Sequence, residues 1–110
     1  MKQVLLDTSF IITCIKQKID FFEELIGYDV LIPKQVIKEL EGLDSKLALR
    51  LLEKNKFKKI DLRLRNVDEG IKNYAKKNKN IIVATLDGEL KKNIKNKKLV
   101  IRFKKRLEVI

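Results

Sequence analysis

Histidine is absent from this chain of 110 residues, and cysteine occurs only once. The first absence excludes Ser-His-Asp and Cys-His nucleophilic catalysis, histidine-based acid–base chemistry and histidine-ligated zinc. A single cysteine, Cys14, excludes an internal disulfide and a thiolate metal cluster. Its isoleucine neighbours predict a small buried side chain. Ionised chemistry near neutral pH must therefore come from Asp, Glu, Lys or this one thiol.

Long hydrophobic runs are also missing. The apolar stretches are well under the roughly 20 residues that a membrane helix needs. The N-terminus begins with a strand-like run rather than the charged-then-apolar pattern of a signal peptide. Hydrophobic residues make up 45% of the chain and charged residues 37%, which is typical of a globular protein. We therefore expect one domain over residues 1–110, a cytoplasmic location and no membrane contact.

Negative charge is scarce relative to positive charge. The chain has 26 Lys and Arg against 15 Asp and Glu, which gives a formal net charge of +11. Nine basic residues lie between 88 and 106, where the one acid is Glu89. A second cluster comprises Lys54, Lys56, Lys58, Lys59, Arg63 and Arg65. A lysine-rich solvated surface is one explanation, but the imbalance favours binding of a polyanion such as a phosphate backbone.

Hydrophobic periodicity predicts strands that alternate with helices. Strands are expected at 3–6, 30–32, 58–62 (a weak one, at an edge), 81–86, 99–101 and 107–110. The first helical pattern carries Phe10 and Cys14 and continues through Phe21 to Gly27. Further helices are expected from Pro33 to about Leu43, with Leu43 in the core, over 45–55 with Leu47, Leu49, Leu51 and Leu52 buried, and over 67–78 and 89–96. This order predicts an α/β fold, a three-layer α/β/α sandwich around a mostly parallel sheet.

Four acidic residues stand where such a fold would bring carboxylates together. Asp7 and Asp87 each follow an expected strand, and Glu39 and Asp68 each lie early in an expected helix. Ligands of open parallel sheets bind beyond the carboxyl ends of the strands. Converging carboxylates repel one another unless a cation joins them, and oxygen ligands favour Mg²⁺ or Mn²⁺. The pattern therefore predicts an acidic metal pocket in a basic protein.

Each acid also has a simpler explanation. Asp7 and Asp87 could cap the helices that follow them, and Asp68 could favour a helix N-terminus together with an Asn66 cap and a capping-box partner, Glu69. At 100° per residue, however, Asp68 lies only about 20° from Ala75, so the spacing predicts an inward carboxylate that needs a partner. Glu39 and Glu41 flank opposite edges of an apolar stripe, and spacing does not choose between them.

The ordered segments around these acids resemble the PIN-domain nucleases. The matching segments are DTSFII at 7–12, IPKQVIKEL at 32–40, VDEGI at 67–71 with Tyr74 and Ala75 after it, and IVATLDGEL at 82–90. The last segment is more similar to the compact branch of ribosomal-RNA-processing nucleases than to the longer toxin branch. Leu86 departs from the pattern, because the family often has Asn or Arg there, but this removes no metal ligand.

The resemblance implies a metal-dependent endoribonuclease that cleaves single-stranded RNA. The catalytic quartet would be Asp7, Glu39, Asp68 and Asp87, with Asp7, Asp68 and Asp87 as the main ligands of Mg²⁺ or Mn²⁺. Thr8, Ser9 and Thr85 would orient carboxylates or waters, and Glu89 is an outer alternative. RNA contacts are expected from Lys91, Lys92, Lys95 and Arg102.

The biological role stays open at this point. The resemblance allows ribosomal RNA processing, a toxin ribonuclease with an antitoxin partner, or a catalytically silent RNA-binding module. A homodimer and a protein partner, either an antitoxin or a ribosome-processing factor, are expected by analogy with the family. A phosphorylatable receiver domain is disfavoured, because the adjacent N-terminal acids and the lysine after a later strand are absent.

Overall fold

The computed structural model describes residues 1–103 and 105–110; Lys104, one of the nine basic residues noted above, lies outside them. That part of the chain contains six strands and six helices. Their order is β1 (Gln3–Leu6), α1 (Thr8–Lys16), α2 (Phe21–Glu24), β2 (Asp29–Pro33), α3 (Lys34–Gly42), α4 (Lys46–Glu53), β3 (Lys58–Ile60), α5 (Val67–Lys77), β4 (Ile82–Ala84), α6 (Gly88–Lys92), β5 (Lys98–Arg102) and β6 (Arg106–Val109).

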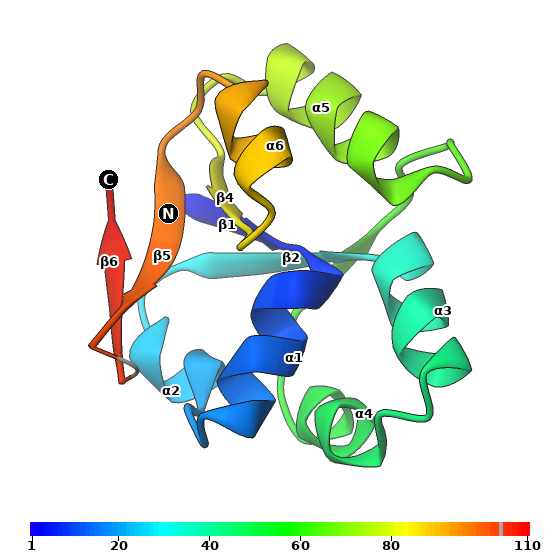
Figure 1. The fold of residues 1–110 in the computed structure, drawn as a ribbon, viewed down its shortest axis with the longest axis vertical. Coiled ribbons are helices and arrows are strands. Elements are labelled where there is room, and N and C mark those ends of the chain that lie inside the picture. The colour runs from blue at the N-terminus through cyan, green and yellow to red at the C-terminus, as the bar shows by residue number, and fades with distance from the viewer. Residues whose placement is uncertain (104) are drawn as a thin grey trace.

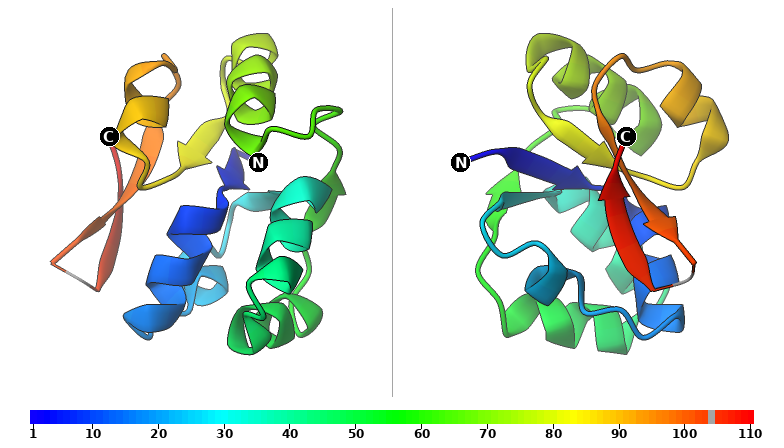
Figure 2. Two further views of the ribbon diagram at one scale, coloured as in Figure 1. Left: turned by 45° about the vertical axis from the view of Figure 1, so that its right-hand side comes forward. Right: turned by 90° about the vertical axis from the view of Figure 1, so that its left-hand side faces the viewer.

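One six-stranded sheet forms the middle layer, in the order β3-β2-β1-β4-β5-β6. All neighbours are parallel except the last pair, β5 and β6, which are antiparallel. Helices α1 to α4 cover one face of this sheet, and α5 and α6 cover the other (Figures 1 and 2). The predicted three-layer α/β/α fold is confirmed, and the weak strand predicted near residue 58 is the edge strand β3.

Strand β1 lies at the centre of the sheet because its side chains are apolar on both faces. Val4, Leu5 and Leu6 are fully buried, as expected for a parallel strand covered by helices on both sides. Its two neighbours, β2 and β4, lead into helices on opposite faces, so the strand order reverses direction beside β1. Such a switch point opens a crevice beyond the carboxyl ends of the strands. Asp7 lies at this end of β1, where its N–H donates to the carbonyl of Ala84, 2.9 Å away.

The helical pattern predicted to run from Phe10 to Gly27 is interrupted, and that prediction is wrong. Helix α1 ends at Lys16, and Lys18 adopts a left-handed backbone conformation with φ 58°. Asp20 then begins the short helix α2, because its Oδ1 accepts hydrogen bonds from the N–H groups of Phe22 and Glu23. The apolar periodicity is nevertheless meaningful, since the ring of Phe21 packs edge-on against that of Phe10, with centroids 6.3 Å apart.

Two leucines predicted to be in the core are exposed. Leu43 follows the last turn of α3 and is 61% exposed, and Leu47 is 65% exposed. The buried positions of α4 are Ala48 and Leu52, four residues apart on one face, whereas Leu49 and Leu51 are half-buried. Leu47 precedes Ala48 by one residue and therefore projects about 100° away from it.

The chain beyond β4 enters the core sooner than predicted. Helix α6 ends at Lys92 instead of continuing to residue 96. Ile94 and Asn96 are buried, and the Asn96 amide Nδ2 donates to the carbonyls of Ala75, Asn78 and Ile81 at 3.0–3.2 Å. A buried amide bonded in this way fixes the turn between α5 and β4.

The fold also bears on the single cysteine and on the short apolar runs of the sequence. Cys14 is fully buried, as predicted, and burial raises the pKa of its thiol to about 12. Among the described residues, no helix combines the length and the apolar character that crossing a membrane requires.

Candidate active site

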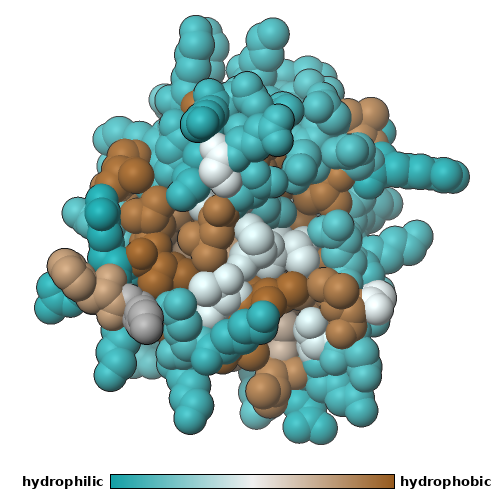
Figure 3. All heavy atoms as spheres, viewed as in Figure 1, coloured by the Kyte–Doolittle hydropathy of each residue, from teal (hydrophilic) through white to brown (hydrophobic). Residues whose placement is uncertain are grey.

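A depression of about 580 Å³ lies beyond the carboxyl ends of β1 and β4. Its lining contains all four predicted acids and no basic residue: Asp7, Thr8, Ser9, Ile12, Thr13, Glu39, Gly42, Leu43, Asp68 and Asp87. The acids come from four separate segments, namely the end of β1, α3, the first turn of α5 and the start of α6. We call this feature the acidic depression. Figure 3 shows the face of the molecule that is seen in Figure 1. At its centre, side chains of intermediate or hydrophobic character are surrounded by hydrophilic ones.

Asp7 forms the buried base of the acidic depression, since the residue is only 5% exposed. Its Oδ1 accepts from the N–H of Thr8 at 2.8 Å, so the residue does cap α1. Its Oδ2 accepts from the hydroxyls of Thr85 at 2.8 Å and Ser9 at 3.3 Å. Desolvation is the largest influence on this group and raises its pKa despite these hydrogen bonds, and the nearby Asp68 carboxylate raises it further.

The hydroxyls of Ser9 and Thr85 join the ends of β1 and β4. Besides bonding to Asp7, Ser9 Oγ accepts from the N–H of Leu86 at 3.1 Å, and Thr85 Oγ1 accepts from the N–H of Asp87 at 3.1 Å. Leu86, which departs from the family pattern, thus contributes to the site through its backbone. These contacts fix the strand ends relative to one another, which is the orienting geometry expected for such hydroxyls.

Helix α3 contributes Glu39. Its carboxylate accepts a short hydrogen bond from the hydroxyl of Thr8, which ties α3 to the first residue of α1. Glu41, the alternative that spacing left open, lines a neighbouring groove instead of the acidic depression. The geometry therefore favours Glu39 as the member from this helix.

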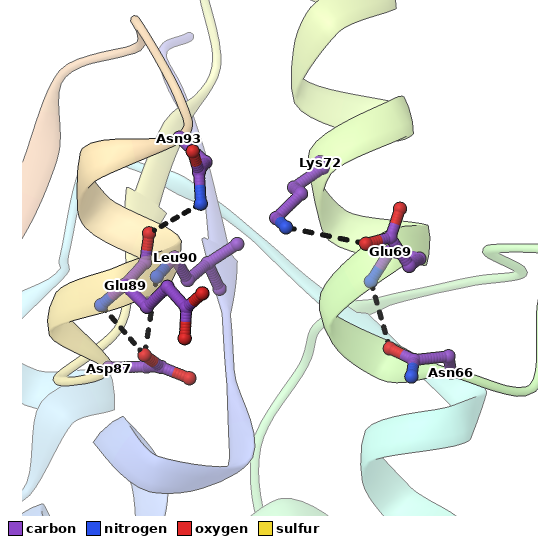
Figure 4. Close-up of polar contacts among 7 residues, drawn as sticks. All are labelled: Asn66, Glu69, Lys72, Asp87, Glu89, Leu90 and Asn93. Atoms are coloured by element: carbon purple, nitrogen blue, oxygen red, sulfur yellow. Dashed lines mark hydrogen bonds and ion pairs between the residues drawn. The ribbon is translucent and has the colours of Figure 1, made fainter.

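Asp87 begins α6, and Figure 4 shows its side chain at the helix N-terminus. Its Oδ1 accepts from the N–H groups of Glu89 at 2.9 Å and Leu90 at 3.2 Å. The capping explanation therefore holds for Asp87, but it occupies only one of the two oxygens. The carboxylate of Glu89 extends toward α5 in the same view (Figure 4), and it lies close enough to Asp68 to raise the pKa of that carboxyl.

Asp68 is exposed, so the prediction that its carboxylate points into the core is wrong. The buried positions of α5 are Val67, Gly70, Ile71 and Ala75, and at 100° per residue Asp68 lies just outside the stripe that they form, beyond its Ala75 edge. Desolvation raises the pKa of Asp68, and the carboxylates of Asp87 and Glu39 raise it further. The carboxylate of Glu69 ion-pairs with Lys72 at 3.3 Å instead of completing a capping box with Asn66 (Figure 4).

The donor atoms of the acidic depression fit a hard divalent cation, because they are all carboxylate or hydroxyl oxygens. None of the ion pairs found among the described residues involves a member of the quartet. Lys72 nevertheless lies close enough to lower the pKa of Asp68. Across residues 1–103 and 105–110, no three acidic groups approach closely enough to form a preassembled cation cage. In chemistry the donor set therefore suits a hard divalent cation, and Asp68 and Asp87 lie nearer to solvent than Asp7.

The residues expected to contact RNA lie beside α6 and at the end of β5. Lys91 and Lys92 are in the last turn of α6, the helix that Asp87 begins, and Lys95 follows it as an exposed residue. Arg102 ends β5, and its Nε donates to the carboxylate of Glu108 at 2.7 Å. The three lysines are therefore better suited than Arg102 to contact an external anion.

Thr13 was not predicted, yet it lines the acidic depression. It lies one turn after Ser9 on α1, and residues four apart share a helix face. That spacing could have identified it from the sequence.

Comparison with known proteins agrees with this geometry. A sequence model described as a PIN like domain matches residues 4–106. Ribonuclease VapC4 of Methanocaldococcus jannaschii is 36% identical over 127 aligned positions, which cover 99% of this chain and 97% of that protein. The solved structure of the PIN domain endonuclease Utp24 matches with a TM-score of 0.85 and 29% identity, covering 97% of this chain and 90% of that one.

A third relative is longer than this chain. The rRNA-processing protein fcf1 of Schizosaccharomyces pombe is 35% identical over 101 positions, which cover 84% of this chain and 53% of that protein. This chain therefore spans about half the length of fcf1. The match to the family model covers most of the sequence, and the chain belongs to the PIN-like domain family. The resemblance drawn from the four sequence segments is confirmed.

Proposed function

We propose that this protein is a divalent-metal-dependent endoribonuclease that hydrolyses single-stranded RNA in the acidic depression. The observation that carries the proposal is the convergence of four carboxylates, from four separate segments, in one depression whose lining contains no basic residue. The endonuclease and ribonuclease relatives support this reaction class.

The quartet divides the work according to burial. Asp7 is buried and hydrogen-bonded on both oxygens, so its carboxyl group is held in a fixed position at the base of the site. Asp68 and Asp87 face the opening from two helix N-termini and would hold the exposed side of a cation. Glu39 is held by Thr8 and would orient the attacking water or help hold a second ion. Attack by water would leave a 5′-phosphate and a 3′-hydroxyl.

When bound, Mg²⁺ or Mn²⁺ supplies activation of water and neutralisation of charge on the phosphate. Thr8, Ser9 and Thr85 act through the carboxylates, since each donates to one of them. The lysines at 91, 92 and 95 contribute electrostatic attraction to the RNA backbone on the α6 side.

A cleavage assay tests the proposal. Labelled single-stranded RNA is incubated with wild type in Mn²⁺, with wild type in excess EDTA, and with Asp7→Asn. We expect cleavage only in the first reaction, with a fall of about a thousandfold or more for Asp7→Asn, equivalent to about 4 kcal/mol of activation free energy. The amide can still bond to Thr8, Ser9 and Thr85, so the variant is expected to fold.

Asp44→Asn is the matched control. Asp44 is exposed, has a left-handed backbone with φ 54° and does not line the acidic depression. Asn tolerates that conformation, so this carboxylate-to-amide change should leave cleavage unchanged. Full activity in Asp7→Asn or in EDTA would contradict the proposal.

Two biological roles and one silent alternative share this fold. Full-length similarity to Ribonuclease VapC4 is compatible with a toxin ribonuclease, and similarity to fcf1 with ribosomal RNA processing. Induced expression separates these roles: arrested growth indicates a toxin, whereas accumulation of precursor rRNA after depletion indicates processing. A silent RNA-binding module would bind RNA without any response to Mn²⁺.

A further inference from the structure

A second depression, of about 840 Å³, lies next to the acidic one. We call it the basic groove. Helix α3, the edge strand β3 and the segment 61–67 form its walls, and five basic and two acidic side chains line it with four others: Lys34, Gln35, Ile37, Lys38, Glu39, Glu41, Lys59, Arg63, Leu64, Arg65 and Val67. Glu39 borders both depressions, so the basic groove begins where the acidic depression ends.

The wall that carries Arg63 and Arg65 is held in one conformation from two sides. On the α3 side, Asp61 Oδ1 accepts from the Gln35 amide at 2.7 Å and from the N–H of Arg63 at 2.8 Å. Asp61 also ion-pairs with Lys34 at 3.1 Å. Arg63, whose N–H donates to Asp61, adopts a left-handed backbone with φ 61°.

On the α5 side, Leu62 packs against Gly70, where an added Cβ would lie 2.8 Å from Leu62 Cβ. The close packing therefore depends on the missing side chain at position 70. A groove wall fixed in this way loses little conformational entropy when a ligand binds.

The composition of the basic groove suits a nucleotide chain. Lys38, Lys59 and Arg65 are exposed and belong to none of the ion pairs found among the described residues, so they are available to phosphates. Leu64 is 40% exposed among these cations and offers an apolar contact for a ribose or base. A second basic depression, lined by Lys2, Lys77, Lys79 and Lys97, lies at the amino ends of β1 and β4 and does not adjoin the acidic depression.

We propose that the basic groove binds the phosphate backbone of the RNA strand on one side of the cleavage position. This proposal rests on the proposed function. The strand runs from the α6 lysines, across the acidic depression, into the groove between α3 and the 61–67 segment. An acidic polypeptide is disfavoured, because it would have to continue over the carboxylates of the neighbouring depression without the divalent ions that a phosphodiester cleavage site provides.

The test measures RNA binding without metal, by fluorescence anisotropy in EDTA, with a labelled single-stranded RNA of about twelve nucleotides. The groove variant combines Lys38→Gln, Lys59→Gln and Arg65→Gln. Lys34 and Arg63 are left unchanged because an ion pair and a left-handed backbone make them structural. The matched control removes the same charge at the opposite edge of the sheet through Lys77→Gln, Lys79→Gln and Lys97→Gln.

We expect Kd to be about tenfold or more higher for the groove variant than for wild type near 0.1 M salt. The slope of log Kd against log salt concentration should fall by about 2, as the loss of three phosphate contacts predicts. The control should change Kd less than about threefold, through net charge alone. An equal loss in both variants, no loss in the groove variant, or displacement of RNA by polyglutamate as effectively as by unlabelled RNA would overturn the proposal. Thermal unfolding of each variant verifies the fold.

A kinetic arm separates this proposal from the proposed function. In Mn²⁺ the groove variant should raise KM while kcat stays the same, whereas Asp7→Asn should lose kcat and retain RNA binding. If neither wild type nor any variant cleaves RNA, but the groove variant binds RNA more weakly than wild type, the catalytic proposal fails and the proposal for the basic groove stands. If wild type cleaves and the groove variant keeps both KM and Kd, the groove proposal fails alone.

Discussion

Asp7 and Asp61 are both multiply hydrogen-bonded aspartates at the carboxyl edge of the sheet, yet their pKa values move in opposite directions. Asp7 is buried, and desolvation raises its pKa although two hydroxyls and an N–H donate to it. Asp61 is exposed, and hydrogen bonds from Gln35, Arg63 and Lys34 lower its pKa to about 2.

The difference shows how the same residue type serves two purposes. Around Asp61 the donors satisfy an ionised carboxylate in water, so the charge stabilises the segment that walls the basic groove. In the acidic depression, burial and neighbouring carboxylates oppose ionisation at Asp7 and Asp68. Charge there is costly in the metal-free protein, and a cation would relieve that cost.

The largest expected effect is a difference in kcat between a variant of the acidic depression and a variant of the basic groove wall. Asp68→Asn should lower kcat by about a hundredfold or more, because it removes a carboxylate at the opening of the acidic depression. Asp61→Asn should leave kcat unchanged and raise KM, because Asp61 only positions the groove wall. Steady-state kinetics on one RNA substrate measures both, and a loss of kcat in Asp61→Asn would break the distinction.

The second effect concerns the energetic cost of the carboxylates. Saturating Mn²⁺ should stabilise the folded protein by about 2.7 kcal/mol at a hundred times Kd, which corresponds to a rise of several degrees in Tm. Differential scanning fluorimetry measures this rise. The rise should disappear in Asp7→Asn and persist in Asp44→Asn, and an equal rise in all three proteins would indicate non-specific ion binding.

The third effect tests the close packing behind the groove wall. Gly70→Val should destabilise the protein by about 1–3 kcal/mol, because the new side chain overlaps Leu62. Chemical denaturation measures the loss. Gly42→Ala is the control for stability, since nothing lies within 4 Å of an added Cβ there and alanine favours a helix. If Gly70→Val leaves the free energy of unfolding unchanged, the 61–67 segment moves to accommodate the new side chain, and the close packing does not fix the groove wall.

The smallest effect concerns how the stability of the metal-free protein depends on pH. Asp61 and Asp68 should contribute to it with opposite signs. The lowered pKa of Asp61 gives stability that is present above about pH 4 and is lost as pH falls toward 2. Asp61→Asn should therefore be less stable than wild type at pH 7, and the gap should close near pH 2.

The raised pKa of Asp68 acts with the other sign. Its contribution is present below its ordinary pKa of 3.8 and is lost as pH rises through the raised value. Asp68→Asn should therefore be more stable than wild type at pH 7 and equal to it in acid. Both differences should be small, about one or two degrees in Tm, because these side chains are exposed to solvent. Shifts of the same sign in both variants would refute the contrast.

Much of this arrangement could be predicted from the sequence, because strong apolar runs such as Val4–Leu6 and Ile82–Ala84, alternating with helical patterns, are typical of buried parallel strands. Acids that follow such strands must then lie at the same edge of the sheet. Asp7 and Asp87 were predictable on these grounds, and the sequence segments around them also identified the family.

The remainder depends on packing that periodicity does not encode. The inward orientation predicted for Asp68 assumed that a position about 20° from Ala75 lies inside the apolar stripe, whereas the buried stripe ends at Ala75 and leaves Asp68 just outside it. The end of α1 depends on a left-handed residue, Lys18, which no pattern indicates. Spacing did not separate Glu39 from Glu41; the family resemblance named Glu39, and the contact that holds it at the site, with the hydroxyl of Thr8, spans 31 positions of sequence.

The central position of β1 has a consequence for synthesis of the chain on the ribosome. Asp7 emerges early, but Thr85, the hydroxyl that fixes it, follows 78 positions later. Until β4 has been translated and inserted beside β1, the two halves of the carboxylate cluster belong to unfolded and separate stretches. A nascent polypeptide that still lacks β4 therefore has no assembled carboxylate cluster.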